Sequence, residues 1–179
     1  ILIGGDGNDV LDGGDGSDTA SFASANSSVT VYLPVAQQNN NAGAAAGVSL
    51  ISIENLVGSG FADLLVGDSI ANRITGGGGS DTLVGGDGQD TLDGGDGFDT
   101  VSYAGSTASV ALSLSGGGAG GAASGDIYVS IERVQGTDFD DEISGDGFDN
   151  QLEGADGNDT LIGGGGNDTL LGGAGNDLM

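Results

Sequence analysis

The chain has 179 residues, of which 40 are glycine and 27 are acidic against only two basic ones, and it contains no histidine or cysteine. Its formal charge of −25 disfavours nucleic acid as a partner and predicts that bound cations are needed to keep the chain compact, because like charges repel. The lack of cysteine excludes disulfides, and no apolar run approaches the roughly 18 residues of a membrane-spanning helix.

A nine-residue phrase, Gly-Gly-x-Gly-x-Asp-x-hydrophobic-x, opens the chain at Gly4 and is repeated in phase at Gly13. Further copies begin at Gly76, Gly85, Gly94, Gly154, Gly163 and Gly172. A unit this short cannot bury a core alone, so neighbouring copies must stack on one another. Because the phrase is entered and left in mid-repeat, we expect the array to continue beyond this sequence.

Two stretches interrupt the phrase and resemble each other. Alternating apolar residues at 29–33 and again at 110–114 predict short half-buried strands, each followed by a loop of small residues. The sequence therefore predicts one continuous solenoid with two inserts. In chain order, its parts are the end of an upstream block (1–21), an insert with strands (22–57), a repeat block (58–102), a second insert with strands (103–135) and a last repeat block (136–179).

The first two repeats after each insert depart from the phrase in a matched way. The sixth position holds Asp63 and then Asn72 after the first insert, and Asp141 and then Asn150 after the second. Matched departures indicate a defined end to a stack of repeats, or an unusual turn.

In the regular phrase, the six leading residues suit a tight turn and the last three suit a short strand with one inward side chain. Two phrases form one flattened coil, so turns stack every second repeat and their sixth-position carboxylates form columns. The predicted inward residues are Leu11, Ala20, Leu65, Ile74, Leu83, Leu92, Val101, Ile143, Leu152, Leu161 and Leu170.

These columns predict metal sites. Carboxylates at roughly the 5 Å separation of parallel strands repel one another unless a cation lies between them. Oxygen ligands without histidine or cysteine favour Ca²⁺ over zinc, copper or iron, and Mg²⁺ is less suited because it demands octahedral geometry. The predicted side-chain ligands are Asp9, Asp18, Asp63, Asp81, Asp90, Asp99, Asp141, Asp159, Asp168 and Asp177.

The spacing also predicts which ligands share an ion. The expected pairs are Asp63 with Asp81, Asp81 with Asp99, Asp141 with Asp159, and Asp159 with Asp177. Asn72 pairs with Asp90 and Asn150 with Asp168, so we expect these two places to be weaker or closed by hydrogen bonds. The partners of Asp9 and Asp18 fall upstream or in the first insert.

The strict hexads and their nine-residue spacing resemble the repeats-in-toxin (RTX) family of calcium-binding repeats, which are exported by type I secretion. The resemblance implies an all-β, right-handed parallel β-roll solenoid, and it implies that carbonyl oxygens of the first four turn positions complete each site. The residues concerned are, for example, Gly76, Gly77, Gly78 and Gly79, and Gly94, Gly95, Asp96 and Gly97. The inserts are similar to those of large secreted RTX proteins, including alginate epimerase repeat modules.

Several other residues have a plain and a functional interpretation. Glu54 and Glu132 occupy equivalent places in the two inserts, and Asp68 and Asp146 occupy equivalent places after them. Each of these residues suits a hydrogen bond or turn cap, and the alternative is an extra calcium site. Arg73 and Arg133 are expected to form local ion pairs. The residues at the third turn position, expected to offer backbone carbonyls, are Asp6, Asp15, Asp87, Asp96 and Asp156.

The aromatic residues Phe22, Tyr32, Tyr103 and Tyr128 suit strand packing, with stacking on sugars as the alternative. No nucleophile with a histidine or lysine partner exists, so the sequence predicts no enzyme. It predicts instead a calcium-binding domain of a secreted or cell-surface protein that folds on Ca²⁺ binding outside the cell. The alternatives are a polysaccharide-binding accessory module of an extracellular enzyme and a surface-layer or adhesin segment that associates with itself.

Overall fold

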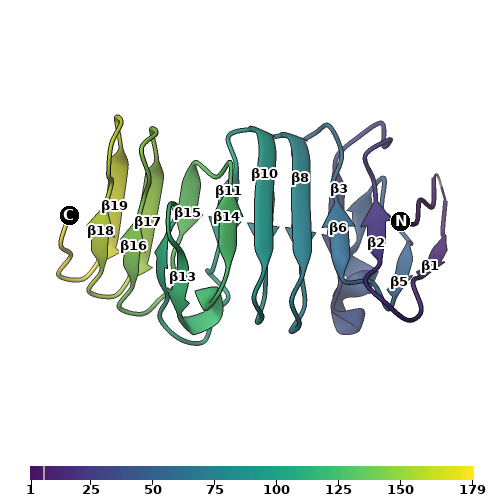
Figure 1. Cartoon of the computed structure of the whole chain (residues 1–179), viewed down its shortest axis with the longest axis horizontal. Coiled ribbons are helices and arrows are strands. Elements are labelled where there is room, and N and C mark those ends of the chain that lie inside the picture. The colour runs from purple at the N-terminus through teal and green to yellow at the C-terminus, as the bar shows by residue number, and fades with distance from the viewer. Residues whose placement is uncertain (6) are drawn as a thin grey trace.

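The computed structural model describes residues 1–5 and 7–179, so the expectation for Asp6 lies outside the described residues. The described chain is all-β, with short strands and two brief 3₁₀ turns, η1 (Val35–Asn40) and η2 (Gly121–Ala123). The strands stack side by side along the long axis of the molecule, with the two termini at opposite ends (Figure 1). No helix in the described chain is long and apolar enough to cross a membrane.

Two larger sheets form the faces of the stack. The five-stranded sheet has the order β14 (Ile127–Val129), β10 (Thr91–Gly97), β8 (Arg73–Gly79), β6 (Asn55–Val57), β2 (Thr19–Ser21). The eight-stranded sheet has the order β19 (Thr169–Ala174), β17 (Gln151–Asp156), β15 (Arg133–Gln135), β11 (Thr100–Ser102), β9 (Thr82–Val84), β7 (Leu64–Val66), β3 (Val29–Tyr32), β4 (Ala42–Gly43).

Two smaller sheets complete the arrangement. One has the order β13 (Gly117–Gly120), β12 (Ala111–Ser113), β16 (Glu142–Ser144), β18 (Thr160–Ile162), and the other pairs β1 (Val10–Asp12) with β5 (Ser49–Ile51). All strand pairs of the described chain are parallel except β3 with β4 and β12 with β13.

The register confirms that two nonapeptides make one coil. Arg73 lies opposite Thr91 in β8 and β10, and Gln151 lies opposite Thr169 in β17 and β19, so stacked residues are 18 positions apart in sequence. Equivalent turns therefore lie directly above one another, which is the geometry on which the predicted carboxylate columns depend.

One inward side chain from each strand of the regular repeats fills the space between the faces. Ten of the eleven predicted inward residues are buried, and Leu65, Ile74, Leu83, Leu92 and Leu152 are fully enclosed. Leu170 is only half-buried, because within the described chain its coil has a neighbour on one side alone. Burying an aliphatic side chain stabilises a fold by about 1.5–3 kcal/mol, so this single row is the main apolar contribution of the solenoid.

The glycine-rich turns are more regular than the sequence predicts. We expected residues 76–79 and 94–97 to be turn only, whereas β8 and β10 continue through them, with Gly77 opposite Gly95 and Gly79 opposite Gly97 (Figure 1). The reason is the close approach of neighbouring coils, since a Cβ on Gly97 would collide with the carbonyl oxygen of Gly79.

Each insert runs ahead by one coil and then returns. In the first insert, β3 pairs forward with β7, after which β5 returns to β1 and β6 to β2. In the second, β12 pairs forward with β16, after which β14 returns to β10 and β15 to β11. The predicted alternating residues, Val29 to Leu33 and Val110 to Leu114, are buried at their inward positions.

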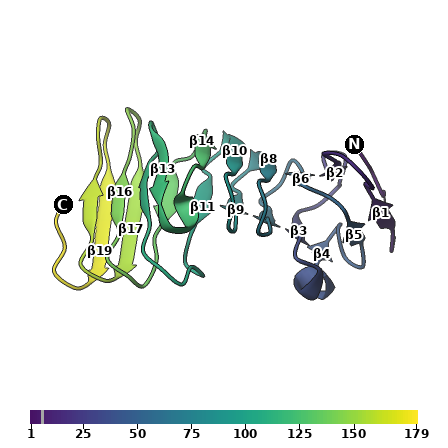
Figure 2. The same ribbon diagram turned by 60° about the horizontal axis from the view of Figure 1, so that its bottom comes forward.

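Side-chain amides take the place of a strand in the first insert. The Gln38 amide donates to the carbonyls of Leu33 and Leu50 and accepts the Leu50 N–H, so it links β3 to β5. Asn41 accepts the Tyr32 N–H and donates to the Val48 carbonyl. Figure 2 shows η1 outside the sheets next to β4 and β5, where these amides satisfy backbone groups that have no strand partner.

Candidate metal centre

The sixth-position side chains of stacked turns form two series. The first series lies before strands of the eight-stranded sheet and contains Asp63, Asp81, Asp99 and Glu132, then Asn150 and Asp168. The second series lies on the opposite edge of the coil and contains Asp18 and Glu54, Asn72, Asp90 and Asp126, then Asp141, Asp159 and Asp177.

The same kind of hydrogen bond recurs between stacked members of both series. The backbone N–H of Asp63 donates to Oδ1 of Asp81 at 2.8 Å, and the Asp81 N–H donates to Oδ1 of Asp99 at 2.8 Å. The structure makes the same bond between the other predicted partners: Asn72 to Asp90, Asp141 to Asp159, Asn150 to Asp168, and Asp159 to Asp177. In each of these bonds to an aspartate, Oδ1 of the accepting carboxylate is used by the fold.

A buried carboxylate oxygen is left without a partner in five places. The Oδ2 atoms concerned are buried and accept no hydrogen bond within the described chain, and they belong to Asp9, Asp81, Asp90, Asp99 and Asp159. A buried, unpartnered carboxylate oxygen is costly unless a proton or a cation neutralises it.

The electrostatics of these carboxyl groups follow from their burial. Desolvation raises the pKa of Asp81 to about 6, against an ordinary value of 3.8. The hydrogen bond from the Asp63 N–H lowers this pKa, and the negative charges of Asp63 and Asp99 raise it further. Desolvation likewise raises the pKa of Asp90 to about 6 and raises the pKa of Asp99 and Asp159. A site that disfavours its own negative charge is one that a cation stabilises.

Carbonyl oxygens of the next coil lie beside two of these carboxylates. A Cβ on Gly76 would be closer than 3.0 Å both to Oδ2 of Asp81 and to the carbonyl oxygen of Gly94. A Cβ on Gly154 would meet Oδ2 of Asp159 and the Gly172 carbonyl in the same way. No group of three or more acidic side chains of the described chain converges on one point, so backbone carbonyls must complete any cation site.

Four turns after the inserts close on themselves instead. In turn 58–63, the Ser59 hydroxyl donates to Oδ1 of Asp63 at 2.8 Å and the Ser59 N–H donates to Oδ2. Thr137 makes the same two bonds to Asp141 in turn 136–141. Both oxygens of Asp63 and of Asp141 are therefore hydrogen-bonded, in contrast to the glycine-rich turns.

The asparagine turns close in a related way. The Asp68 N–H donates to Oδ1 of Asn72, whose amide donates to the Glu54 carbonyl, and the Asp146 N–H donates to Oδ1 of Asn150. We expected these positions to be weaker sites or to be closed by hydrogen bonds. Both Oδ1 atoms are closed in this way, whereas the buried Nδ2 of Asn150 has no partner within the described chain. We call turns 58–63, 67–72, 136–141 and 145–150 the self-bonded turns.

The backbone angle at the second turn position separates the two kinds of turn. Gly77 has φ of 113°, a region that glycine reaches freely and that other residues avoid. Ser59, Asp68, Thr137 and Asp146 hold that position without a positive φ, and their N–H groups face the sixth side chain. An inward N–H group attracts a carboxylate and repels a cation, so a side chain at this position changes what the turn can bind.

Asp126 is not among the ligands that the sequence predicts, and Glu54 and Glu132 have two interpretations there, a hydrogen bond or turn cap and an extra calcium site. Glu54 accepts the Asp18 N–H and Glu132 accepts the Asp99 N–H, each at 2.8 Å, so both take the place of a sixth-position aspartate. Asp126 accepts the Asp90 N–H at 2.8 Å and the Tyr103 hydroxyl at 2.7 Å. Asp126 lies five residues after Gly121, at the sixth position of a degenerate hexad.

The aromatic residues and arginines have local roles. The Tyr103 and Tyr128 hydroxyls lie 2.6 Å apart, both rings are buried, and desolvation raises the pKa of both phenols. Arg73 lies 3.7 Å from Asp93 and Arg133 pairs with Glu153, which confirms the expected ion pairs.

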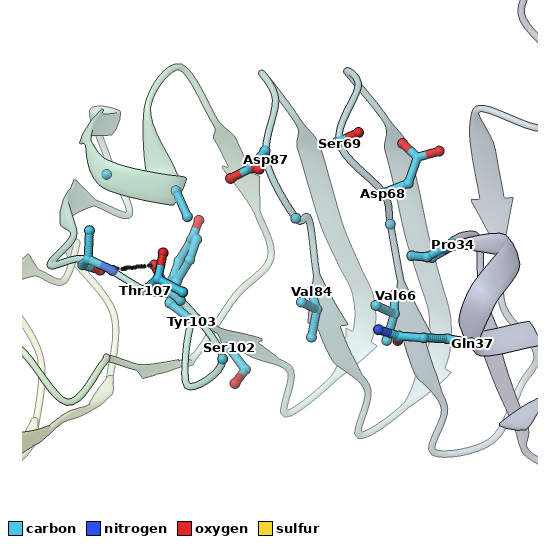
Figure 3. Close-up of a pocket in the computed structure, with 17 residues that line it drawn as sticks. Pro34, Gln37, Val66, Asp68, Ser69, Val84, Asp87, Ser102, Tyr103 and Thr107 are labelled. Atoms are coloured by element: carbon cyan, nitrogen blue, oxygen red, sulfur yellow. Dashed lines mark hydrogen bonds between the residues drawn. The ribbon is translucent and has the colours of Figure 1, made fainter.

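A groove of about 770 Å³ lies over β7 and β9 between the two inserts (Figure 3). Pro34 and Gln37 of the first insert line one end, and Tyr103 and Thr107 of the second line the other. Val66 and Val84 contribute apolar side chains to the lining, and its hydroxyls and carboxylates come from Asp68, Ser69, Asp87, Ser102 and Ser106. Because Tyr103 is only 4% exposed, its ring offers no stacking face to a sugar.

Comparison with known families agrees with this geometry. The model of the RTX calcium-binding nonapeptide repeat (4 copies) matches residues 1–23, 66–101 and 144–179, which is more than half of the chain. The chain therefore belongs to the family of RTX calcium-binding repeat proteins. A search of curated proteins finds none that matches it. The self-bonded turns 58–63 and 136–141 fall outside the matched residues.

Family membership implies Ca²⁺, and the residues present fit that ion. Its preferred ligands are carboxylate and carbonyl oxygens in flexible numbers. The glycine-rich turns offer both, and their buried Oδ2 atoms lack any other partner. The self-bonded turns offer no such atom.

Proposed function

We propose that this chain is a calcium-binding, right-handed β-roll module of a secreted or cell-surface protein, and that it folds when it binds Ca²⁺ outside the cell. The observation that carries the proposal is the set of five buried Oδ2 atoms without a hydrogen-bond partner. Each makes the folded chain unfavourable without a cation, so folding and binding are coupled. RTX repeats are typically structural, and we propose a role without catalysis.

The proposed ligands belong to the glycine-rich turns. Carboxylate ligands are Asp9, Asp18, Asp81, Asp90, Asp99, Asp159, Asp168 and Asp177, and carbonyl ligands come from Gly76 to Gly79 and Gly94 to Gly97. Asp63 and Asp141 matched the same spacing, but both of their oxygens are hydrogen-bonded, so we propose that they hold the self-bonded turns together. A bound Ca²⁺ would supply positive charge between coils that otherwise repel.

Linkage explains how the environment could control folding. A ligand that binds only the folded state stabilises it by about 2.7 kcal/mol per site when its concentration is 100 times the dissociation constant. Extracellular calcium modules have dissociation constants of about 10⁻⁴ to 10⁻³ M. A chain with a charge of −25 would then stay largely unfolded in the cytosol, in a state suited to export, and fold outside.

The test is circular dichroism of the chain in excess chelator and in millimolar Ca²⁺, with Mg²⁺ at the same concentration as control. We expect strand signal to appear with Ca²⁺ and little of it with Mg²⁺. An identical spectrum in chelator and in Ca²⁺ would overturn the proposal.

A second candidate function is binding of a neutral polysaccharide in the groove between the inserts. Its hydroxyl, amide and carboxylate lining suits sugar hydroxyls, whereas Asp68 and Asp87 disfavour an anionic polymer. Glycan-array binding in Ca²⁺, compared with a Ser106→Trp variant that fills the groove, tests this candidate. Equal glycan binding by both proteins would place any sugar site elsewhere.

A further inference from the structure

Two serines in the inserts adopt a backbone conformation that serine normally avoids. Ser52 has φ of 50° and Ser130 has φ of 49°, and within the described chain only Ala155 is another non-glycine residue with positive φ. The two serines stand at equivalent places, each at the start of a Ser-Ile-Glu segment and two residues before its glutamate. Positive φ is disfavoured for residues with a Cβ, so a repeated instance calls for a compensating contact.

The conformation of Ser130 directs its carbonyl oxygen at the glycine-rich turn 94–99. A Cβ on Gly94 would be closer than 3.0 Å to this oxygen and also to Oδ2 of Asp99. The same pairing of a buried Oδ2 with a carbonyl of the next coil occurs for Asp81 with Gly94 and for Asp159 with Gly172. Of these three pairings, only the one at Asp99 takes its carbonyl from an insert.

Glu132 supplies a carboxylate in place of the sixth-position aspartate that a regular next coil would contribute. Its Oε2 accepts the Asp99 N–H at 2.8 Å, just as Oδ1 of Asp99 accepts the Asp81 N–H at 2.8 Å. Ser130 and Glu132 thus reproduce the first-position carbonyl and the sixth-position carboxylate of a regular turn. They do so where the second insert replaces the next hexad.

We propose that Asp99, the Ser130 carbonyl and Glu132 form a calcium site at the junction between turn 94–99 and the second insert. The inference rests on the proposed calcium function and adds an insert-borne site to it. The insert then closes the calcium stack of the first series, instead of merely interrupting the repeat.

Two comparisons within the molecule support this assignment. In the first insert, the Ser52 carbonyl lies against Gly13 and Glu54 accepts the Asp18 N–H, so the arrangement occurs twice. In the second series, by contrast, Asp126 takes the position next to Asp90, and both of its oxygens are occupied by the Asp90 N–H and the Tyr103 hydroxyl. The two edges of the same insert therefore end differently.

The first test counts bound ions. Equilibrium dialysis of the whole chain with Ca²⁺ is compared for wild type, Glu132→Gln and Glu142→Gln, where Glu142 is an exposed glutamate on β16. Glutamine can still accept the Asp99 N–H, so the fold should survive while one ligand charge is lost. We expect Glu132→Gln to lose one ion, or to bind one ion at least tenfold more weakly, and Glu142→Gln to match wild type.

Two results separate the inference from the proposed function. If wild type binds Ca²⁺ and Glu132→Gln binds the same number of ions with the same affinity, the junction site is wrong and the calcium function stands. If wild type binds no Ca²⁺, both fail. A crystal structure of the wild-type chain grown in Ca²⁺ gives a test that no variant can confuse: we expect anomalous signal in contact with Asp99 and the Ser130 carbonyl, and its absence there overturns the site.

Discussion

Within the described residues, Ala155 is the one residue with a side chain that holds the second position of its turn at positive φ, with φ of 82°. An L-residue in this backbone region destabilises the folded state by roughly 1–2 kcal/mol. Glycine avoids this strain, but part of the gain is offset because glycine increases the conformational entropy of the unfolded chain. We expect Ala155→Gly to stabilise the calcium-loaded protein by about 0.5–1 kcal/mol, measured by denaturant unfolding. Ala174→Gly, at the third position of the next turn on the same edge and without positive φ, is the control and should give no gain. Equal gains from both would mean that the backbone angle is not the cause.

The Ser59 hydroxyl is the residue-scale feature that closes the first self-bonded turn. Removing it leaves a buried oxygen of Asp63 with one partner fewer, which costs about 1–2 kcal/mol. We expect Ser59→Ala to lose that much stability in saturating Ca²⁺, measured by denaturant unfolding, whereas Ser80→Ala should be neutral because Ser80 is exposed in a glycine-rich turn. A neutral Ser59→Ala would show that the closure contributes nothing.

At the scale of one turn, a self-bonded turn should be convertible into a glycine-rich turn. Turn 58–63 departs from the hexad at Ser59 and at Phe61, whose side chain is exposed at the position where glycine otherwise stands. We expect the double variant Ser59→Gly with Phe61→Gly to bind one more Ca²⁺ than wild type in equilibrium dialysis. The carbonyl oxygen of Gly76, which would complete the new site, already lies beside Asp63.

The matched control is the pair Ser59→Ala with Phe61→Ala, which removes the same side-chain groups without allowing positive φ at the second position. This control should bind no additional ion. An extra ion in the control, or none in the glycine variant, would contradict the role given to the second position.

The strands and their stacking could be predicted because the repeat is local. The nine-residue spacing alone predicts that stacked residues are 18 positions apart, as Arg73 and Thr91 are, and that Leu83 and Leu92 are buried. The self-bonded turns were visible only as departures at Asn72 and Asn150, since the decisive contacts of Ser59 and Thr137 depend on a backbone angle that no composition reveals.

The inserts were harder to predict because distant residues decide their paths. The pairing of β3 with β7 and the return of β5 to β1 are accompanied by contacts of the Gln38 and Asn41 side-chain amides, which link the two parts of the insert. Asp126 becomes a member of the second series because Tyr103, 23 residues earlier, folds back onto it. Short apolar runs identify such strands, but they do not identify their partners.

Across the whole molecule, inserts and self-bonded turns divide the charge into separate stacks. Each insert adds buried apolar residues to the core that the coils share, with Val31, Leu33 and Leu50 in the first and Leu112 and Val110 in the second. These regions depend on packing, whereas the glycine-rich turns between them depend on neutralised carboxylates. Calcium removal should therefore destabilise the acidic turns first and, through the shared core, the inserts with them.

The acidic part predicts an unusual response to pH in the absence of calcium. Desolvation raises the pKa of Asp81 and Asp90 in the folded state to about 6, against an ordinary 3.8, so these groups contribute stability that is complete below the ordinary value and lost as pH rises through 6. In chelator, we expect circular dichroism to show more strand at pH 5 than at pH 7.5. Asp81→Asn with Asp90→Asn should gain structure at pH 7.5 and flatten this dependence, while Asp138→Asn, an exposed carboxylate, should keep it and so separates burial from the change in total charge. If the chain in chelator lost structure on acidification to pH 5, the buried carboxylates would not be what keeps the calcium-free fold from forming at neutral pH.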